Sequence, residues 1–376
     1  MVLKPDGISA LIDLLKKQGY CTIGPQVRNG AIVLEELEKG TDLPIGWQDS
    51  QDGGKYHLKH TKAKTIFGFN HGPHSWKRWL HSSGLCLWKA KSDGTDFKVQ
   101  VTPEEPSKYA FIGVRSCELR AIEIQDNVFL NSQYKDSYYQ RHRDGNFIVA
   151  VNCSRGGGTC FCVSTDSGPR VKSGYDLLLT EVYSGTTHYF LVEVGTKRGA
   201  DVIANLPTTP AESAQVDQAA GIVAEAARQM GRMLETRDIK QLLYRNLEHP
   251  RWAEVASRCL TCGNCTLVCP TCFCTTVEDV TDLTGTEAER WRRWDSCFTM
   301  DFSYIHGGSV RTSHGMRYRQ WLTHKLASWQ DQFGSLGCVG CGRCITWCPV
   351  GIDITEEARA IRESDSIDPM ANKGKE

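Results

Sequence analysis

The sequence predicts an α+β protein in which an N-terminal α/β domain is followed by a helix-rich C-terminal domain. Three observations carry this prediction. Strand-like apolar runs alternate with helical patterns over residues 1–205, a stretch with Pro and Thr follows at 206–214, and cysteines are concentrated in the last third of the chain. Alternating strands and helices are typical of α/β domains, whereas a Pro- and Thr-containing stretch marks a linker.

The composition is that of a globular protein with two or three domains. The chain has 376 residues, of which 40% are hydrophobic and 23% charged, and this excludes disorder and a disulfide-only scaffold. The 44 Lys and Arg residues balance 44 Asp and Glu residues, which excludes a strong overall attraction to nucleic acids or anionic membranes. The mean hydropathy is -0.37. Because we find no transmembrane run and no signal sequence, we expect a cytoplasmic protein.

The elements of the N-terminal domain follow from the periodicity of its apolar residues. An amphipathic helix is predicted over residues 8–17. Strands are predicted at 110–114, which leads directly into a helix, and at 147–151. A further pair of strands is predicted at 176–182 and 188–194.

Composition sets the remaining boundaries. A helical pattern rich in Ala, Glu and Arg runs from residue 215 to residue 244, after the linker. The predicted units are the α/β domain at 1–205, linker and helix at 206–244, the cysteine-rich domain at 245–360 and a polar tail at 361–376.

Cysteine usage indicates metal binding rather than disulfides. Eleven of the 17 cysteines lie between Cys259 and Cys348, and the total is odd. Two motifs repeat the spacing C-x2-C-x2-C-x3-C followed by proline. The first consists of Cys259, Cys262, Cys265 and Cys269, and the second of Cys338, Cys341, Cys344 and Cys348. In bacterial iron–sulfur proteins with this spacing, the fourth cysteine of each motif binds the cluster of the other motif.

The spacing therefore predicts two [4Fe–4S] clusters with crossed ligands. Cluster 1 takes Cys259, Cys262, Cys265 and Cys348, and cluster 2 takes Cys338, Cys341, Cys344 and Cys269. Glycines at 263, 340 and 342 are expected to let the backbone approach the clusters. Structural zinc is the alternative, but zinc sites usually combine two C-x2-C pairs, which the triple spacing does not match.

The segment between the motifs is long, because residues 270–337 separate them. This length resembles that of α-helical ferredoxin-type domains rather than of small ferredoxins, and we predict helices at 287–294 and 316–330. Three further thiols occur in the segment. They are Cys272, Cys274 and Cys297. The favoured interpretation is that they are buried packing residues, and the alternative is that they belong to a further redox centre.

Four cysteines of the N-terminal domain follow its predicted strands. Cys117 lies just beyond one strand. Cys153 lies just beyond another, on a loop that continues through three glycines to Cys160 and Cys162. Open α/β sheets bind ligands at the carboxyl ends of their strands. The four thiols are therefore candidate ligands of a third iron–sulfur cluster, with packing cysteines or a redox-active pair at Cys160 and Cys162 as the alternatives.

Motifs of nucleotide binding and hydrolysis are absent. The sequence has no G-x-G-x-x-G after a strand, no P-loop, no G-x-S-x-G and no H-E-x-x-H. We therefore predict no catalytic residue and no cofactor beyond the clusters. The basic and aromatic segment HGPHSWKRWLH at 71–81 is predicted to be a solvated loop, with a partner surface or an anion site as the alternative.

The cysteine segments resemble those of a known family. The residues at 113–130, 152–162, 259–274, 292–297 and 338–349 look like the beta subunit of cytoplasmic NAD(P)-linked [NiFe] hydrogenases (sulfhydrogenases), and are also similar to the corresponding iron–sulfur subunit of anaerobic sulfite reductase. The resemblance implies an electron-transfer subunit with two cubane clusters on the eight motif cysteines. It also implies partner subunits that bind flavin and NAD(P)H or hold a nickel–iron or siroheme centre. The four N-terminal cysteines belong to the family pattern.

Three functions are compatible with these residues. The favoured one is an iron–sulfur subunit that relays single electrons between a flavin/NAD(P)H subunit and the catalytic subunit of a cytoplasmic [NiFe] hydrogenase, with a siroheme sulfite reductase as the alternative setting. The second is an enzyme with a catalytic cluster at the N-terminal cysteines, which turnover by the isolated chain would support. The third is a free ferredoxin fused to a binding module, which co-purification of partners would exclude.

Overall fold

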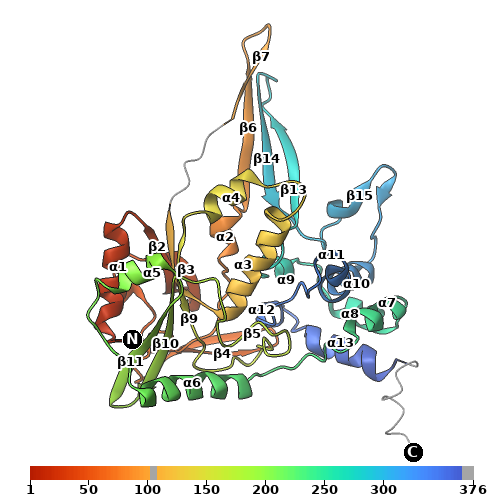
Figure 1. Ribbon diagram of the computed structural model, residues 1–376. Helices are drawn as coiled ribbons and strands as arrows, with labels where there is room; N and C mark the ends of the chain where they lie inside the picture. Colours follow the sequence, from red (N-terminus) through yellow and green to blue (C-terminus); the bar gives the residue numbers. More distant parts are fainter. Residues whose placement is uncertain (102–107, 366–376) are drawn as a thin grey trace, which may run out of the picture.

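A mixed eight-stranded sheet forms the N-terminal part of the molecule, at the lower left of the computed structural model in Figure 1. The structure describes residues 1–101 and 108–365. The strands lie in the order β12–β1–β11–β10–β9–β8–β2–β3. Their bounds, in that order, are Thr208–Thr209, Val2–Leu3, Thr187–Val194, Leu177–Ser184, Phe147–Val151, Tyr109–Val114, Cys21–Arg28 and Ala31–Glu36.

Helices cover both faces of this sheet. The first face carries α1 (Asp6–Lys17) and α5 (Lys197–Ile203). The second carries α3 (Ser116–Phe129), with the shorter α2 (Lys77–Leu80) and α4 (Ser137–Arg143). The central strands are therefore buried on both sides, which is why β8 and β9 are continuous apolar runs rather than alternating ones.

The central strands of the sheet are parallel. β8 pairs in parallel with β2 and β9, and β9 pairs in parallel with β10. The helix and the four strands predicted in this domain are confirmed within two residues at each end. Because β8 and β9 are parallel neighbours, their carboxyl ends meet at one edge, and the segments with Cys117 and Cys153 begin there.

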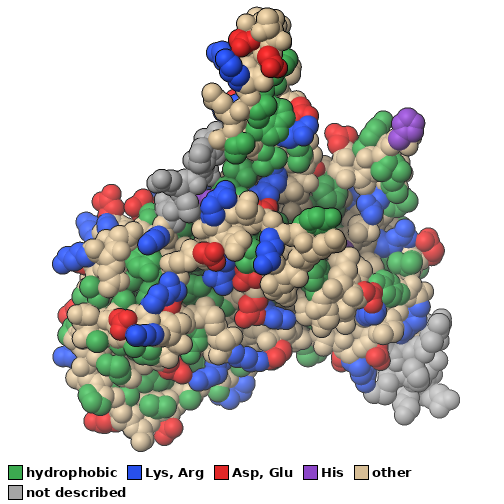
Figure 2. Space-filling view, turned by 45° about the horizontal axis from the view of Figure 1, so that its top comes forward, with side chains coloured by type: hydrophobic (Ala, Val, Ile, Leu, Met, Phe, Trp, Pro, Cys, Tyr) green, Lys and Arg blue, Asp and Glu red, His purple; other side chains and the backbone are tan. Residues whose placement is uncertain are grey.

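A second sheet forms an arm that projects from the molecule at the top of Figure 1. Its order is β13–β14–β6–β7, with bounds Thr275–Thr281, Glu287–Trp294, Gly84–Ser92 and Phe97–Gln100. Apolar side chains gather on its surface in Figure 2, and Phe97, Val99, Val277, Val280 and Leu283 are exposed there. The arm joins strands from both sides of the predicted boundary at residue 205.

The helix predicted at 287–294 is wrong, because this segment is strand β14. Cross-strand contacts outweigh its local helical pattern. Glu287 and Glu289 pair with Lys91 and Lys89 of β6, and Arg290 pairs with Asp279 of β13. The C-terminal half of the molecule is therefore not built from helices alone.

Helix α6 (Ser213–Arg228) packs on the eight-stranded sheet, against β10 and β11. The remaining helices surround the motif cysteines, where a second core forms. They are α7 (Ile239–Arg245), α8 (Arg251–Arg258), α9 (Asn264–Leu267), α10 (His314–Thr323), α11 (Trp329–Phe333), α12 (Arg343–Thr346) and α13 (Ile354–Glu363). Two hairpins complete the fold: β4 (Trp47–Asp52) with β5 (Lys55–His60), and β15 (Tyr304–Ile305) with β16 (Gly308–Ser309).

Two of the predicted helices are interrupted. The pattern at 215–244 is split between α6 and α7, which are separated by residues 229–238. The segment at 316–330 is helical, but a π-helical turn at His324–Ser328 joins α10 to α11. The predicted tail overlaps the last turn of α13, and its residues 366–376 lie outside the described part of the chain. Among the described residues, no helix is long and apolar enough to cross a membrane.

Candidate metal centres

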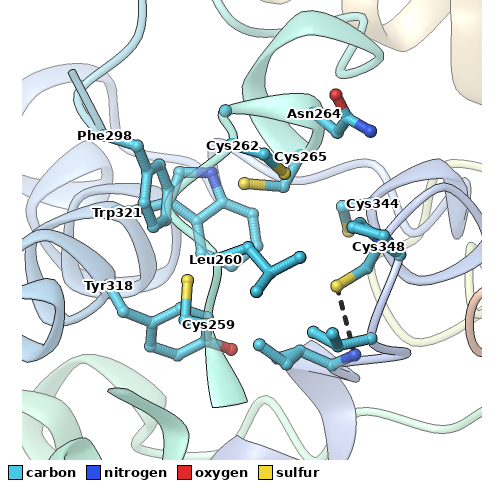
Figure 3. Close-up of a pocket in the computed structure, with 14 residues that line it drawn as sticks. Cys259, Leu260, Cys262, Asn264, Cys265, Phe298, Tyr318, Trp321, Cys344 and Cys348 are labelled. Atoms are coloured by element: carbon cyan, nitrogen blue, oxygen red, sulfur yellow. Dashed lines mark hydrogen bonds between the residues drawn. The ribbon is translucent and has the colours of Figure 1, made fainter. Parts of the chain in front are cut away.

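The first motif lies around a cavity with an apolar wall (Figure 3). Cys259 follows the end of α8, and Cys265 lies in α9. The cavity has a volume of about 430 Å³, and Cys348 of the second motif enters it from the opposite side. Its other lining side chains include Phe298, Tyr318 and Trp321. Three cysteines of the first motif therefore line one cavity together with Cys344 and Cys348 of the second motif.

The second motif gathers beside Cys269 of the first. Burial raises the pKa of the Cys344 thiol well above its ordinary value, and Cys338, Cys341 and Cys269 are its strongest electrostatic neighbours. Burial likewise raises the pKa of Cys338 to about 12. The fold therefore places Cys269 of the first motif beside the second motif, while Cys344 of the second motif also borders the cavity of the first.

A buried lysine stands beside the second group. Lys325 of the π-helical turn is 7% exposed and lies 3.2 Å from Cys269 Sγ. Burial opposes ionisation of the Cys269 thiol, but the Lys325 ammonium lowers its pKa below the ordinary value. Lys325 also donates to Thr271 Oγ1 and to the Gly337 carbonyl. A buried cation aimed at a cysteine sulfur fits the anionic charge of a thiolate-bound cluster.

The four N-terminal cysteines converge on the second motif. Cys117 lies in the first turn of α3, and burial, followed by the charges of Cys162 and Cys341, raises its pKa. Burial raises the pKa of Cys160 to about 12, with Cys153 as the next contributor. Cys160 Sγ lies 3.8 Å from the Cys341 carbonyl oxygen. The edge of the parallel sheet therefore presents its thiols to cluster 2 of the prediction.

The glycines of the second motif make room for protein backbone. Gly342 has a φ of +75°, and a Cβ there would lie 2.3 Å from the Thr159 carbonyl oxygen. Gly340 has a φ of +59°, and a Cβ there would lie 2.6 Å from the backbone of Phe161. The Phe161 amide donates to the Gly340 carbonyl at 2.8 Å. These glycines let the N-terminal cysteine loop dock on the motif. The sequence predicts a different role for them, in which they let the backbone approach a cluster.

A buried ion pair joins the same two segments. Arg343, between the second and third cysteines of its motif, donates to Glu118 at 2.6 Å, and both side chains are nearly inaccessible to solvent. Arg343 also donates to the carbonyls of Gly72 and His74. Glu118 follows Cys117 directly, so the pair fixes one cysteine segment against the other.

The segment at 71–81 is not a solvated loop, as the sequence predicted. His71 is buried and its Nε2 lies 3.0 Å from Cys117 Sγ. Trp76 is 1% exposed and donates to Glu118, and Lys77 is 5% exposed. His71 points inward to the Cys117 sulfur and the Glu118 carboxylate, and Lys77 is also buried, whereas Arg78 is exposed.

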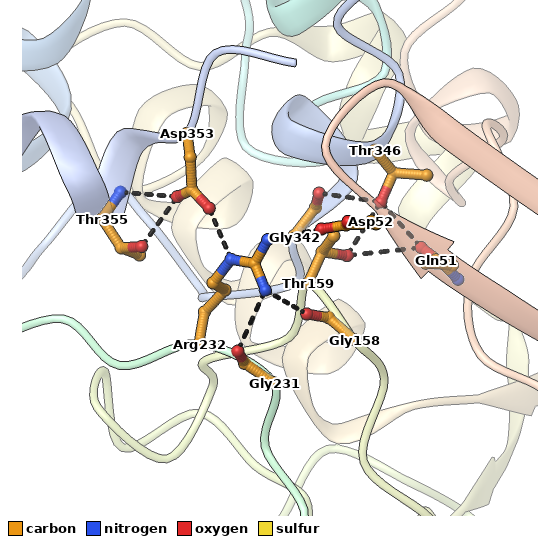
Figure 4. Close-up of polar contacts among 10 residues, drawn as sticks. All are labelled: Gln51, Asp52, Gly158, Thr159, Gly231, Arg232, Gly342, Thr346, Asp353 and Thr355. Atoms are coloured by element: carbon orange, nitrogen blue, oxygen red, sulfur yellow. Dashed lines mark hydrogen bonds and ion pairs between the residues drawn. The ribbon is translucent and has the colours of Figure 1, made fainter.

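A polar network secures the cysteine loop from the other side (Figure 4). Arg232 donates to Asp353, Asp52 and the Gly158 carbonyl. Thr346 of α12 bonds to Thr159 and Gln51. The loop that bears Cys160 is therefore held by the β4–β5 hairpin, by the segment after α6 and by the second motif.

The three extra thiols belong to neither crossed set. Cys272, Cys274 and Cys297 line a cavity of about 340 Å³ next to Lys325. A hydrogen bond from Cys274 and the charges of Lys77 and Lys325 lower the pKa of Cys272 to about 5. Among the described residues, no three His, Cys, Asp or Glu side chains are close enough to hold a single metal ion.

Sequence patterns did not identify the charged residues of these centres. Lys325, Arg343, Glu118 and His71 are single residues in elements far apart in sequence. The local signals were weak: Glu118 follows a candidate cysteine, Arg343 lies inside a motif, and His71 begins the basic segment for which an anion site was the alternative.

Comparisons with known proteins agree with this geometry. A family model described as a 4Fe-4S dicluster domain matches residues 258–352. The chain is 32% identical to sulfhydrogenase 2 subunit beta of Pyrococcus furiosus over 259 residues, which are 68% of this chain and 75% of the relative. No solved structure matches the chain.

Proposed function

Since the chain belongs to the family of sulfhydrogenase beta subunits, we propose that it is the iron–sulfur subunit that carries electrons within a hydrogenase-like complex. The observation that carries the proposal is the cavity in which Cys348 faces Cys259, Cys262 and Cys265. Crossed ligation of this kind is typical of proteins with two cubane clusters. When bound, such clusters accept and donate one electron at a time.

In this proposal the eight motif cysteines hold two [4Fe–4S] clusters. Cluster 1 is bound by Cys259, Cys262, Cys265 and Cys348, and cluster 2 by Cys338, Cys341, Cys344 and Cys269. The helices α8 to α13 supply an α-helical ferredoxin-type frame around them. The Lys325 ammonium beside Cys269 and the Arg343 guanidinium beside Cys341 stabilise the negative charge of the thiolates and favour the reduced state.

A third cluster on Cys117, Cys153, Cys160 and Cys162 is also part of the proposal. Its support is the convergence of Cys117, Cys160 and Cys162 on Cys341, a proposed ligand of cluster 2. Cys153 is a neighbour of Cys160 and Cys162. The three clusters would then form a series from the first motif, through the second, to the edge of the parallel sheet.

Each end of the proposed series of clusters would exchange electrons with a different partner subunit. We propose that one end faces a subunit that binds flavin and NAD(P)H, because this chain has no nucleotide-binding motif of its own. The other end faces a catalytic subunit. The relative is named a sulfhydrogenase subunit, and this favours a [NiFe] hydrogenase over a siroheme sulfite reductase as the catalytic partner.

Pairs of serine substitutions in the full-length chain test the crossed ligation. Both C259S and C348S remove ligands of cluster 1, so the double variant should lose about four irons, no more than either single variant. C259S/C269S should lose about eight irons, because its two cysteines belong to one motif but to different clusters. If the ligation were uncrossed, C259S/C348S would lose about eight irons and C259S/C269S about four. That result would contradict the assignment. C86S, in β6 of the arm, is the control.

A separate double variant tests the third cluster. C153S/C160S should lose about four irons together with their sulfide, while the electron paramagnetic resonance signals of clusters 1 and 2 persist. An unchanged iron content would show that these thiols are packing residues or a thiol redox pair.

A further inference from the structure

The cavity lined by Cys272, Cys274 and Cys297 is separate from the sites described above. It lies between the base of the arm and the π-helical turn, and His324, Lys325 and Trp329 complete its wall. Trp321 borders both this cavity and that of cluster 1. The three cysteines are more than packing residues, because they surround a space instead of filling one.

The β13–β14 hairpin brings the three thiols together. Cys274 directly precedes β13 and Cys297 follows the end of β14, while Thr275 and Trp294 are cross-strand partners. The Asp295 amide donates to the Cys274 carbonyl at 2.9 Å and closes the hairpin at its base. Cys272 lies one residue before Phe273, and its thiol shares a hydrogen bond with that of Cys274. Cysteines over twenty residues apart in sequence thus reach one cavity.

Two buried lysine ammonium groups near the cavity require a negatively charged neighbour. Lys77 and Lys325 are both buried, and within residues 1–101 and 108–365 neither forms an ion pair with Asp or Glu. Lys77 Nζ donates to the Leu267 carbonyl at 3.3 Å and lies 4.0 Å from the centre of the Trp294 ring. A buried ammonium without a counter-charge costs several kcal/mol. Cluster 2 supplies that charge to Lys325 through Cys269, but Lys77 needs another source.

The strongest electrostatic partners of Lys77 are the sulfurs of this cavity. In order of strength they are Cys272, Cys269 and Cys274. The Cys272 thiol, whose pKa is lowered, gives Lys77 a negative neighbour, and metal-bound thiolates would carry the same charge. The buried lysines therefore lie where the thiolates of a metal site would need positive charge.

We propose that Cys272, Cys274 and Cys297 bind a further iron–sulfur cluster in this cavity, beyond the two clusters of the motifs and the one at the edge of the sheet. Each thiol gives up its proton on binding iron. The three cysteines would be its ligands, and His324 and Lys325 complete the wall of the cavity that would hold it.

The placement of the thiols favours a cluster over zinc. Zinc ligands approach the ion to within about 2.0–2.3 Å, but no three His, Cys, Asp or Glu side chains of the described residues are close enough to hold a single ion. A disulfide would use only two of the three thiols. The π-helical turn supports a site as well, because such turns are frequent at functional positions.

Anaerobic native mass spectrometry of the full-length chain tests the proposal, because it counts iron and sulfide on each polypeptide independently of partner subunits. C297S and C272S should each lose about three or four irons with their sulfide relative to wild type. C86S, a cysteine of the same sheet, should lose none. Paramagnetic resonance spectra of the variants should retain the signals of clusters 1 and 2, which shows that the fold is intact.

Other outcomes overturn the proposal. Equal iron in C297S, C272S and C86S would make the three thiols structural, and loss of one zinc instead of iron would make the site a zinc site. If both variants lose every cluster through misfolding, C153S/C160S decides, because it lacks any cluster at the edge of the sheet: about eleven or twelve irons require the further cluster, and about eight exclude it. A wild-type chain without iron would instead refute the proposed function.

Discussion

At the scale of single residues, the pair formed by Glu118 and Arg343 is the contact most sensitive to substitution. Both side chains are almost fully buried and lie 2.6 Å apart. Removing the charge of Glu118 leaves the Arg343 guanidinium buried without a carboxylate, which typically costs about 3–5 kcal/mol. We therefore expect E118Q to lower the free energy of unfolding by this amount, measured as the shift in the midpoint of urea unfolding of the metal-loaded chain.

An exposed pair provides the control for E118Q. Lys91 and Glu287 lie 2.8 Å apart on the arm, with both side chains more than half exposed. Such pairs contribute about 0–1 kcal/mol, so E287Q should leave the midpoint almost unchanged. Equal shifts in E118Q and E287Q would contradict the role given to the buried pair.

His81 predicts how stability depends on pH. Its ring is buried against Phe129, with centroids 4.8 Å apart, and burial followed by the charges of Arg292 and Lys77 lowers its pKa to about 3. The unfolded chain has a histidine pKa of about 6.5 and binds a proton below that pH, whereas the folded chain does not. Stability is therefore lost as the pH falls from 6.5 toward 3, by about 1.4 kcal/mol per pH unit.

Replacement of the ring isolates this effect. H81F keeps an aromatic ring and removes the titrating group, so its unfolding midpoint should fall less between pH 7.5 and pH 5.5 than that of wild type. The quantity to compare is the difference between the two midpoints in each protein. The same difference in H81F and wild type would show that His81 does not carry the acid sensitivity.

Residue-level predictability was uneven. The motif cysteines can be identified from their spacing, because three thiolates at intervals of three residues suit one cubane cluster. Lys325 and Arg343 carry no such signal, because a buried basic residue looks like a surface one until its anionic neighbours are known. The error at 71–81 has the same origin: the segment is basic, and only the fold shows that its charges face buried carboxylate and sulfur.

At the scale of elements, the docking of the cysteine loop on the second motif depends on Gly342. G342A would place a methyl group 2.3 Å from the Thr159 carbonyl oxygen, in addition to the strain of a side chain at a φ of +75°. We expect a loss of about 3 kcal/mol in stability, since clashes with backbone typically add about 1–3 kcal/mol to the strain of the conformation. The measurement is again the midpoint of urea unfolding.

A substitution at Gly334 measures the cost of backbone strain without a clash against the docked loop. It has a φ of +68° at the end of α11, and a Cβ there meets nothing within 4 Å. G334A should therefore cost only the conformational strain, about 1–2 kcal/mol. A loss in G342A no larger than in G334A would contradict the close packing of loop and motif.

Element predictions succeeded where the pattern was set locally. The apolar runs that became β8 and β9 are buried on both faces, so their sequence alone marks them as central strands. The prediction of a helix in the segment of β14 failed because this strand pairs with β6 and β13, and β6 lies about two hundred residues earlier in the chain. Cross-strand ion pairs with Lys89 and Lys91 stabilise a strand that helix periodicity cannot exclude.

At the scale of the whole molecule, the cysteine centres lie where the sheet edge, the two motifs and the arm meet. The mixed α+β class with a C-terminal dicluster domain was predictable, because it rests on local patterns and spacing. The way in which the parts dock was not. It depends on Glu118 with Arg343 and on Arg232 with Asp353, which are pairs over a hundred residues apart.

In the proposed complex, electron flow would depend on the second motif. C344S would remove a proposed ligand of cluster 2, which would occupy the middle of the proposed series. Reduction of NAD(P)+ by hydrogen should therefore fall at least tenfold in a complex carrying C344S. Reduction of a viologen dye by hydrogen, which occurs on the catalytic partner, should remain.

The ratio of these two activities in the purified complex is the measurement that tests the electron-transfer role most directly. C86S serves as the control, because Cys86 lies on the arm outside all the cysteine groups. We expect the ratio of NAD(P)+ reduction to dye reduction to collapse in C344S and to stay at the wild-type value in C86S. A C344S complex that couples hydrogen to NAD(P)+ as well as wild type does would show that electrons bypass this subunit and would contradict the account.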